Sequence, residues 1–594
     1  MKSFLGQIKN KKSILIMLTV IYMSSLFIYA IILVPRPYYI QSTDIENNYY
    51  YDARLIYNGL PTRTVTHPAT PLFYIYSKVF NFTGDNISST QKFLRIIYFS
   101  QTILNILALI IFIRFLPEEQ NPLVKFFMLA IIAASPSFLT YQDYIGADAT
   151  MIIFSVPILL AVWALINKET KSARLLILIG IYLGFLFAVK FSFVLLIVPV
   201  YISLLISSYL WQDWRALKTL LILPIISVFS FLIFISRVVY RLPAIINQTI
   251  LHDMTDGNGV AWVFGRLLAN VEYLMLNRPI FSLTILFVLF SFLSLLTSYF
   301  YNLLRGKIYF SDEDRSIIPQ SILGIFGIII LIYTLAVLGD VPGNSARGEE
   351  LGVTLRNMAL ALILFPFMVL AAIQLAKRIG LNLSKNIYLA LFALSLLLVS
   401  ESVIKHVSYR NHLIKFSSER IKKTEEKLLE FIPKGAKFAI WGSGSYAFGP
   451  AMFHYWGNHR YGWNSFDEEL RKIFDPVGFF QYRVAGQLVG QNRLDTINRN
   501  YALPPILQRY PILAKIYLSW RRKFPPPKET DNILTGEGFG ENPKIVMFPE
   551  VERELPHKDD EKLIELLEYR LGYKFTKRIE NIEGRDWTIF ISED

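Results

Sequence analysis

Two acids stand close together near the start of the chain, in a place where they could do chemistry. Asp44 and Glu46 lie two residues apart, shortly after a hydrophobic run that ends near Val34. A carboxylate beside a membrane is costly to keep without a partner or a task. An ionised carboxylate can take the proton from an attacking hydroxyl. The alternative is structural, because Ser42-Thr43-Asp44 is also a good start for a short helix.

Further acids and a histidine fall in other segments beside apolar runs. Asp143 and Asp148 bracket a turn in YQDYIGADAT, and His67 precedes a proline and an apolar aromatic stretch at 72–82. One of the two aspartates could orient an acceptor or hold a divalent cation, although a metal site would require three or more convergent carboxylates. Their alternative is a solvated loop acid or a helix cap. For His67 it is a capping or structural histidine.

Three cations have the chemistry to hold a phosphate. Lys190 interrupts a long apolar block in FAVKFSF, and Arg347 and Arg356 lie in SARGEELGVTLRNMA. A guanidinium donates two parallel hydrogen bonds to phosphate oxygens, and an ammonium in an apolar run needs a partner. Lys190 could instead extend to the membrane surface, and the arginines could pair with Glu349 or Glu350. Sugar transfer from a lipid phosphate would need a base and such cations together.

The composition places these groups in a membrane protein. The chain has 594 residues, of which 53% are hydrophobic, and its mean hydropathy is +0.40. It has no cysteine, which excludes disulfides, thiolate metal sites and cysteine nucleophiles. Although the net charge is +14, the basic residues cluster between apolar runs, so we expect no nucleic-acid partner.

Eleven apolar runs are long enough to cross a bilayer. They lie at about 13–34, 94–113, 123–141, 149–166, 174–189, 191–210, 217–239, 279–303, 317–338, 356–376 and 386–404. Alternate connections are rich in Lys and Arg, which keeps them and the N-terminus cytoplasmic. The external segments are then 35–92, 142–148, 240–278 and 339–355, and they carry every candidate named above except two. Lys190 lies at an external turn, and Arg356 lies at the external end of the span 356–376. We expect residues 1–404 to form a membrane module in the cell membrane, with residues 405–594 outside.

The region after residue 405 has the composition of a soluble α/β domain. Helical spacing continues over 416–431, and strands are predicted at 436–441, 544–548 and 587–591. The Gly442-Ser443-Gly444 turn lacks the third glycine of a dinucleotide site. An amphipathic segment at 506–523 suits either the membrane interface or packing against its own domain.

The order of these features resembles a known family. Asp44-Ile45-Glu46, the following YYYDARLIYNGLPTRTVTHPATPLFYIYSKVF and the later GIYLGFLFAVKFSFVLLIVP are similar to the GT-C membrane glycosyltransferases. The most similar branch holds the bacterial relatives of protein O-mannosyltransferases and the lipid A aminoarabinose transferases. The resemblance covers the chain to about residue 404.

The resemblance implies a GT-C-type helical fold, a polyprenyl-phosphate-linked sugar donor and inversion at the anomeric carbon. It implies that Asp44 is the base with Glu46 beside it, Asp143 or Asp148 is the second acid, and Lys190 binds the donor phosphate. Arg347 and Arg356 are carried over only by position, because the family's Arg-Tyr pattern is absent there. The acceptor would be an envelope glycan, lipid or protein. No cofactor is expected except an optional divalent cation. A lipid-linked-sugar flippase and a glycan polymerase or ligase are the alternatives.

Overall fold

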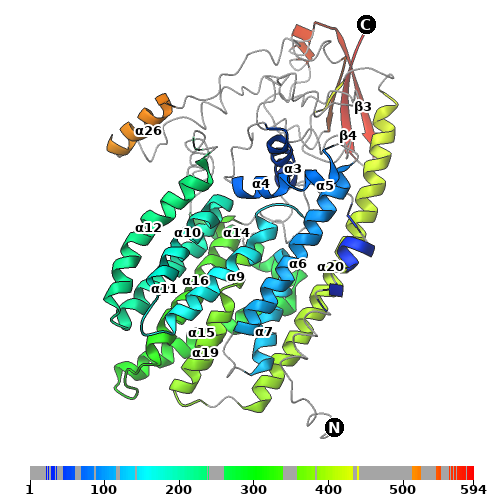
Figure 1. The fold of residues 1–594 in the computed structure, drawn as a ribbon. Helices are drawn as coiled ribbons and strands as arrows, with labels where there is room; N and C mark the ends of the chain where they lie inside the picture. Colours follow the sequence, from blue (N-terminus) through cyan, green and yellow to red (C-terminus); the bar gives the residue numbers. More distant parts are fainter. Residues whose placement is uncertain are drawn as a thin grey trace.

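The computed structural model shows a helical bundle with a smaller sheet at one end (Figure 1). It describes residues 22, 24–25, 28–33, 35–36, 44–59, 69–85, 89–115, 121–140, 144–236, 239, 260–338, 358–381, 384–431, 438–440, 511–523, 544–549, single positions within 561–569, 572–582 and 585–593. At one end of the bundle lie the short helices α3 (Asp44–Tyr57), α4 (Thr70–Ser77) and α5 (Phe80–Thr83). We call this the α3 end and the opposite one the basic end, after its Lys and Arg residues.

In the described part of the chain, ten further helices make up the bundle. They are α6 (Thr90–Phe115), α7 (Pro122–Ala133), α9 (Met151–Ile166), α10 (Ala173–Val189), α11 (Val194–Leu210), α12 (Trp214–Phe234), α14 (Val260–Asn277), α15 (Pro279–Leu304), α16 (Asp314–Tyr333) and α19 (Phe365–Arg378). Short elements join or extend them, namely η1 (Ile28–Leu33), α8 (Pro136–Thr140), η4 (Asp148–Thr150), η5 (Phe191–Phe193), η8 (Thr334–Leu338) and α18 (Met358–Leu362). One long helix, α20 (Lys385–Leu429), runs along the side of the bundle.

Eight described helices are long and apolar enough to cross a membrane, and α7 and α10 are shorter apolar helices. These ten segments coincide with ten of the eleven predicted spans. The remaining one, 13–34, lies largely outside the described residues. The prediction of a polytopic α-helical protein with a C-terminal α/β region is therefore confirmed. Helix α14 is an addition, because the sequence placed only an external segment at 240–278.

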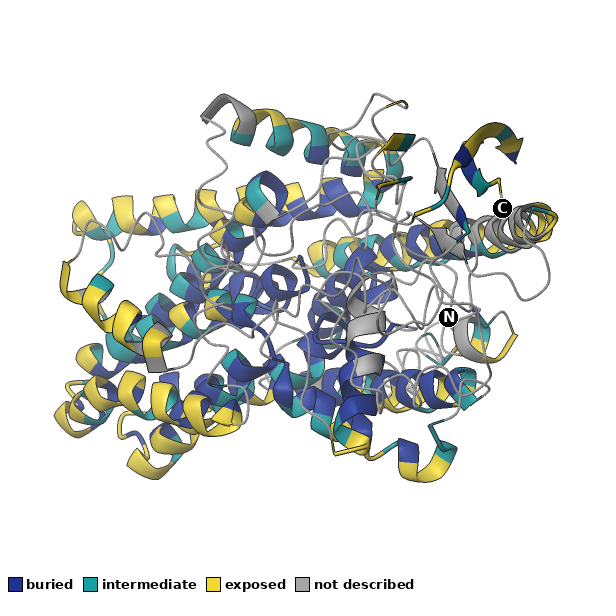
Figure 2. Ribbon diagram, turned by 90° about the horizontal axis from the view of Figure 1, so that it is seen from above, coloured by how far each residue is buried: buried dark blue, intermediate teal, exposed yellow. Residues whose placement is uncertain are grey.

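Burial separates an inner from an outer helical surface. Viewed along the bundle, buried residues occupy the middle and exposed ones the periphery (Figure 2). Helix α19 lies inside, with Phe365, Leu370 and Leu375 fully buried. Helix α12 lies at the periphery, where Leu221, Ile225 and Phe229 form a stripe of side chains that are 69%, 68% and 67% exposed. Such an apolar stripe on a long helix is the surface that lipid covers.

Helices α10 and α12 approach each other closely because α10 carries glycines four residues apart. A Cβ on Gly184 would lie 2.7 Å from Ser230 Cβ and 2.8 Å from the Phe231 nitrogen, and closer still to the Ser227 carbonyl oxygen. The Ser227 hydroxyl donates to the Gly180 carbonyl at 2.9 Å. Small residues at this spacing let membrane helices pack through their backbones.

Polar contacts hold the basic end together. Arg378 of α19 donates to both carboxylate oxygens of Asp314, from Nε at 3.1 Å and Nη2 at 2.8 Å. Asp213 caps α12 through the Ala216 nitrogen and accepts from the Lys171 nitrogen at 2.8 Å. Burial lowers the pKa of the Lys171 side chain to about 8, against the raising effect of the Asp213 carboxylate. These contacts join loops between helices that the positive-inside pattern placed on the same side of the membrane.

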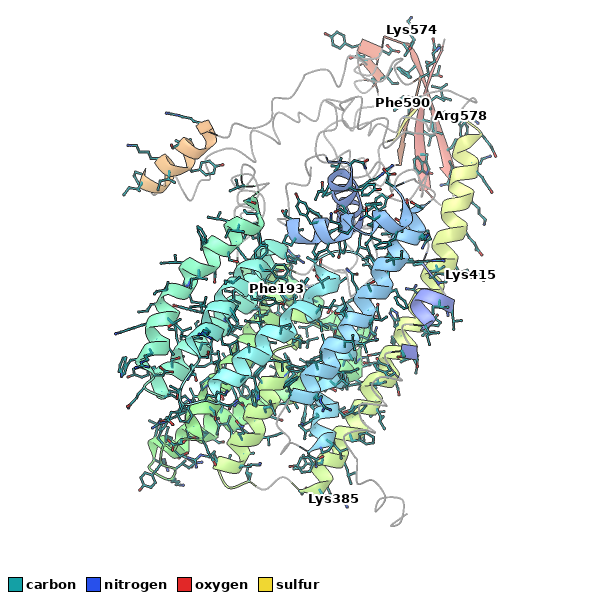
Figure 3. All side chains as sticks on the ribbon, viewed as in Figure 1. Phe193, Lys385, Lys415, Lys574, Arg578 and Phe590 are labelled. Carbon is teal, nitrogen blue, oxygen red and sulfur yellow. The ribbon has the colours of Figure 1, made fainter. Side chains whose placement is uncertain are left out.

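Helix α20 links the bundle to the C-terminal sheet. Lys385 marks its beginning at the basic end, and Lys415 lies far along it beyond the middle of the bundle (Figure 3). Its 45 residues span about 68 Å. Inside the bundle, Glu401 accepts from the nitrogens of Ile280 and Phe281 at 2.8 and 3.0 Å and so caps α15. The sequence predicted a span ending at 404 and a separate helix from 416, whereas the structure has one helix.

Among the described residues, the C-terminal sheet has four strands in the order β1-β2-β4-β3. Strand β1 (Phe438–Ile440) runs parallel to β2 (Ile545–Pro549), and β4 (Arg585–Ser592) pairs antiparallel with both β2 and β3 (Phe575–Ile582). Strand β4 is internal, and its residues 587–590 are buried on both faces of the sheet. The guanidinium of Arg578 stacks on the ring of Phe431, just after α20, at 4.8 Å. The three predicted strands correspond to β1, β2 and β4.

Candidate functional site at the α3 end

Only some of the predicted site residues can be placed. Asp44 is the first residue of α3 and Glu46 lies in its first turn, while their side chains are outside the described part of the chain. A helix does begin at Asp44, as the capping alternative expected, and the helix dipole stabilises acids in the first turn. His67, Asp143, Arg347 and Arg356 are also outside the described residues. Asp148 and Lys190 are the two predicted site residues whose side chains the structure describes.

Asp148 and Lys190 form an ion pair. The Lys190 ammonium donates to a carboxylate oxygen of Asp148, and the two residues are 8% and 7% exposed. Lys190 sits in extended backbone between α10 and η5, and Asp148 begins the short turn before α9. The sequence predicted each residue as a candidate without linking them. The Asp148 carboxylate compensates the unfavourable burial of the Lys190 ammonium in an apolar run.

An arginine that the sequence did not predict as a site residue lies in the region of the Asp148–Lys190 pair. Arg36 is 3% exposed, and its guanidinium lies 4.0 Å from the centre of the Tyr144 ring. Tyr144 is itself 2% exposed and lies four residues before Asp148. A signal was present, because Arg36 directly follows the predicted external end of an apolar run, where the positive-inside rule expects few basic residues.

The segment 144–150 is fixed by polar side chains from neighbouring helices. The Tyr76 hydroxyl of α4 accepts from the Gln101 amide at 2.5 Å and from the Gly146 backbone N–H. The Asn105 amide of α6 donates to the Ala149 carbonyl at 3.0 Å. Burial raises the pKa of the Tyr76 hydroxyl, so it stays protonated at neutral pH. Gly146 has φ of 137°, a conformation that favours glycine and turns the chain toward Asp148.

Helix α3 is docked onto this segment through aromatic rings. Tyr49 packs edge-on against Phe73 and Tyr76 of α4, with ring centres 5.2 and 6.1 Å apart. The next residue of α3, Tyr50, packs against Phe93, and its hydroxyl forms a hydrogen bond of 2.9 Å with the Thr90 hydroxyl. The start of α3 is thus connected to Asp148 through Tyr76 and Gly146. Neither Tyr76 nor Gln101 stood out in the sequence, because each lies in an ordinary amphipathic or apolar run.

The far end of α3 is fixed by a second set of charges. Arg54 is 1% exposed, and its Nε lies 3.9 Å from the Asp85 carboxylate. Asn58 donates to the same carboxylate at 3.2 Å and to the Arg54 carbonyl at 2.9 Å. This arrangement secures the helix and leaves its first turn as the part that carries the predicted base.

The α3 end therefore combines a buried acid, two buried cations and buried phenols beside the apolar bundle. Cations in this environment interact strongly with an anionic group, because water is largely excluded. Within the residues that the structure describes, no three His, Asp or Glu side chains are grouped to hold a metal ion. The chemistry that these groups favour is binding of an anion next to a lipid phase.

Comparison with known proteins gave one kind of match. No protein-family model matches the sequence, and no curated protein does either. Among solved structures, the chain is similar to the crystal structure of ArnT from Cupriavidus metallidurans bound to undecaprenyl phosphate. The sequences are 9% identical, the similarity covers 96% of this chain and 97% of that one, and the TM-score is 0.47.

Proposed function

We propose that the chain is an integral membrane glycosyltransferase that moves a sugar from a polyprenyl-phosphate donor to an acceptor outside the cytoplasm. The acceptor is a glycan, lipid or protein of the cell envelope. The active site would lie at the α3 end, with Asp44 as the general base and Glu46 beside it. Asp143, Asp148 and His67 are proposed to border the acceptor, and Lys190, Arg347 and Arg356 to face the donor phosphate.

One observation carries this proposal. The helix that begins with Asp44 is docked, through Tyr49 and Tyr76, onto the segment that holds the buried Asp148–Lys190 pair. The bundle thus has a carboxylate-bearing helix and buried cations at the same end. A donor with an apolar tail in the bilayer and a phosphate at its surface would require that arrangement.

The reaction would proceed as a single displacement. The Asp44 carboxylate takes the proton from the acceptor hydroxyl while the oxygen of that hydroxyl attacks the anomeric carbon from the face opposite the phosphate. The bond between the anomeric carbon and the phosphate oxygen breaks, and its electron pair leaves with the polyprenyl phosphate. Cations stabilise the charge that develops on that oxygen. The configuration at the anomeric carbon is inverted.

Lys190 would have a double role in this scheme. Before donor binding its charge is balanced by Asp148, which makes the buried ammonium affordable. A phosphate beside the pair would share the ammonium between two anions. Arg36 contributes a second buried positive charge from the same end of the bundle, and its stacking on Tyr144 fixes the guanidinium plane.

The test begins with cells from which the gene is deleted. We expect a polyprenyl-phosphate-linked sugar to accumulate in their lipid extract and to fall again on complementation with the wild-type gene. Asp44→Asn should fail to complement, with transfer by the purified protein reduced roughly 10²- to 10⁴-fold. If no lipid-linked sugar accumulates, the transferase proposal is wrong.

Asp85→Asn is the matched control, because Asp85 is another acid of the same predicted external segment, and asparagine keeps an oxygen that can accept from Asn58 and so hold α3. It should complement the deletion. Full activity of Asp44→Asn would remove Asp44 from the mechanism. Equal loss in both variants, with normal amounts of protein in the membrane, would mean that the segment needs its charge and not a base at residue 44.

A further inference from the structure

Helix α26 (Pro511–Lys523) presents apolar side chains to solvent. Ile512 and Ile516, one turn apart, are 76% and 58% exposed, whereas Tyr517 is only 8% exposed. The helix is therefore attached to the rest of the protein along the flank of Tyr517. The flank of Ile512 and Ile516 faces outward, and two large apolar residues at this spacing form a continuous patch on a helix surface.

The position of α26 indicates what covers this flank. Along the axis of the bundle the helix lies just beyond the level at which α12 ends, and in this view it extends past the side of the bundle (Figures 1 and 3). Helix α12 carries the lipid-facing stripe of Leu221, Ile225 and Phe229. The surface of the bilayer must meet the bundle near the end of that stripe. An element at the height of this end lies at the level of the lipid headgroups.

The charge of α26 fits the same environment. Its sequence, PILAKIYLSWRRK, has four basic residues and no acid. Lys515 and Arg522 are exposed and two turns apart, and they lie roughly 100–120° around the helix from Ile516. Basic amphipathic helices lie in the plane of a membrane with the apolar side in the acyl boundary and the cations at lipid phosphates.

We propose that α26 lies in the headgroup layer of the leaflet at the α3 end, with Ile512 and Ile516 in the acyl boundary and Lys515 and Arg522 at anionic phospholipids. The helix anchors the C-terminal region to the membrane at a point separate from α20. This inference is independent of the reaction that the protein performs.

The absence of cysteine makes a direct test simple. In the full-length chain, Ile516→Cys is labelled with an environment-sensitive fluorophore and reconstituted into nanodiscs of phosphatidylglycerol and phosphatidylcholine. We expect the emission to shift to shorter wavelength and to be quenched by lipids brominated near the headgroup end of the acyl chain. Leu518→Cys, on the opposite side of the helix, is the matched control and should be quenched far less. Ile579→Cys on β3 supplies the value for a label in water.

Three results would overturn the proposal. A label at residue 516 that is as accessible to water-soluble quenchers as the one at residue 579 would show that the flank faces solvent. A label shielded from both water-soluble and lipid quenchers would show that protein covers it, either a second copy or another part of the chain. Equal quenching by lipid in nanodiscs with and without phosphatidylglycerol would overturn the role given to anionic headgroups.

Discussion

The ammonium of Lys190 and the carboxylate of Asp148 meet inside the protein although 42 residues separate them in the chain. One comes from the break between α10 and α11 and the other from the turn before α9. The pair joins two helical hairpins at the α3 end, so it has a structural role whatever ligand binds beside it. Each of the two residues compensates the buried charge of the other, and each is also a candidate residue of the site.

We predict that Lys190→Met destabilises the protein by about 3–5 kcal/mol, because it leaves the buried Asp148 carboxylate without its cation. Combining it with Asp148→Asn should restore most of the loss, since no uncompensated charge remains. Thermal unfolding of the purified variants in nanodiscs measures both effects. If the double variant were no more stable than the single one, the pair would not be the source of the loss.

The double variant also separates stability from binding. We expect the double variant to fold, but it lacks the Lys190 ammonium that is proposed to bind the donor phosphate. Binding of a polyprenyl phosphate, followed by native mass spectrometry, should be weakened in Asp148→Asn/Lys190→Met relative to the wild type. Unchanged binding would remove Lys190 from the donor site while leaving its ion pair in place.

Substitution at Gly184 tests the close approach of α10 and α12. We predict that Gly184→Ala lowers the apparent unfolding temperature, because the new Cβ would collide with the backbone of α12 at Ser227 and Phe231. Gly265→Ala in α14 is the matched control, as nothing lies within 4 Å of its Cβ position. There alanine should be neutral or stabilising by about 0.5–1 kcal/mol, because it lowers the entropy of the unfolded chain. Equal effects at both glycines would contradict the packing described for α10.

The Asp314–Arg378 contact should depend on the shape of the guanidinium. Arg378→Lys keeps the positive charge but cannot donate two parallel hydrogen bonds to Asp314 while also reaching the Tyr309 carbonyl. We therefore predict a clear loss of thermal stability for Arg378→Lys. Arg315→Lys is the control, because the carboxylate that it contacts from Nε at 3.3 Å, Asp312, is 80% exposed. A loss in Arg315→Lys as large as that in Arg378→Lys would show that the geometry is not decisive.

Lys171 predicts a dependence of stability on pH. Its pKa is lowered to about 8 in the folded protein, mainly by burial, from 10.5 when exposed. Between these values the unfolded chain binds more protons, so this group makes the protein more stable as pH rises from about 8 toward 10.5. Below about pH 8 its destabilising effect is fully present. Lys171→Met should remove this contribution, so the wild type should gain stability relative to the variant over that interval. Parallel pH profiles of the two proteins would contradict the assignment.

The membrane helices were predictable because the signal is local. A run of apolar residues must form its own backbone hydrogen bonds in lipid, so hydropathy alone places a helix. The end of α20 was not predictable in this way, because composition changes at about residue 404 while the helix continues to Leu429. A helix that leaves the membrane meets water, and its side chains change without a change in its backbone.

The site was predictable only by residue type. Lys190 was expected to need a partner and Asp148 was predicted as an acid of the site, yet their pairing follows from how α9, α10 and α11 pack. Arg36, Tyr76 and Gln101 act through contacts between segments distant in the chain, and none of them forms a sequence motif. The roles of Asp44, Glu46, His67, Asp143, Arg347 and Arg356 stay predictions.

The length of α20 has a mechanical consequence. One helix carries Glu401 inside the bundle and ends two residues before Phe431, whose ring stacks on Arg578 of β3, so it joins the sheet to the bundle. The carboxylate of Glu401 in turn holds the first turn of α15. A load applied to the sheet and carried along α20 would therefore reach a residue that lies between the membrane helices.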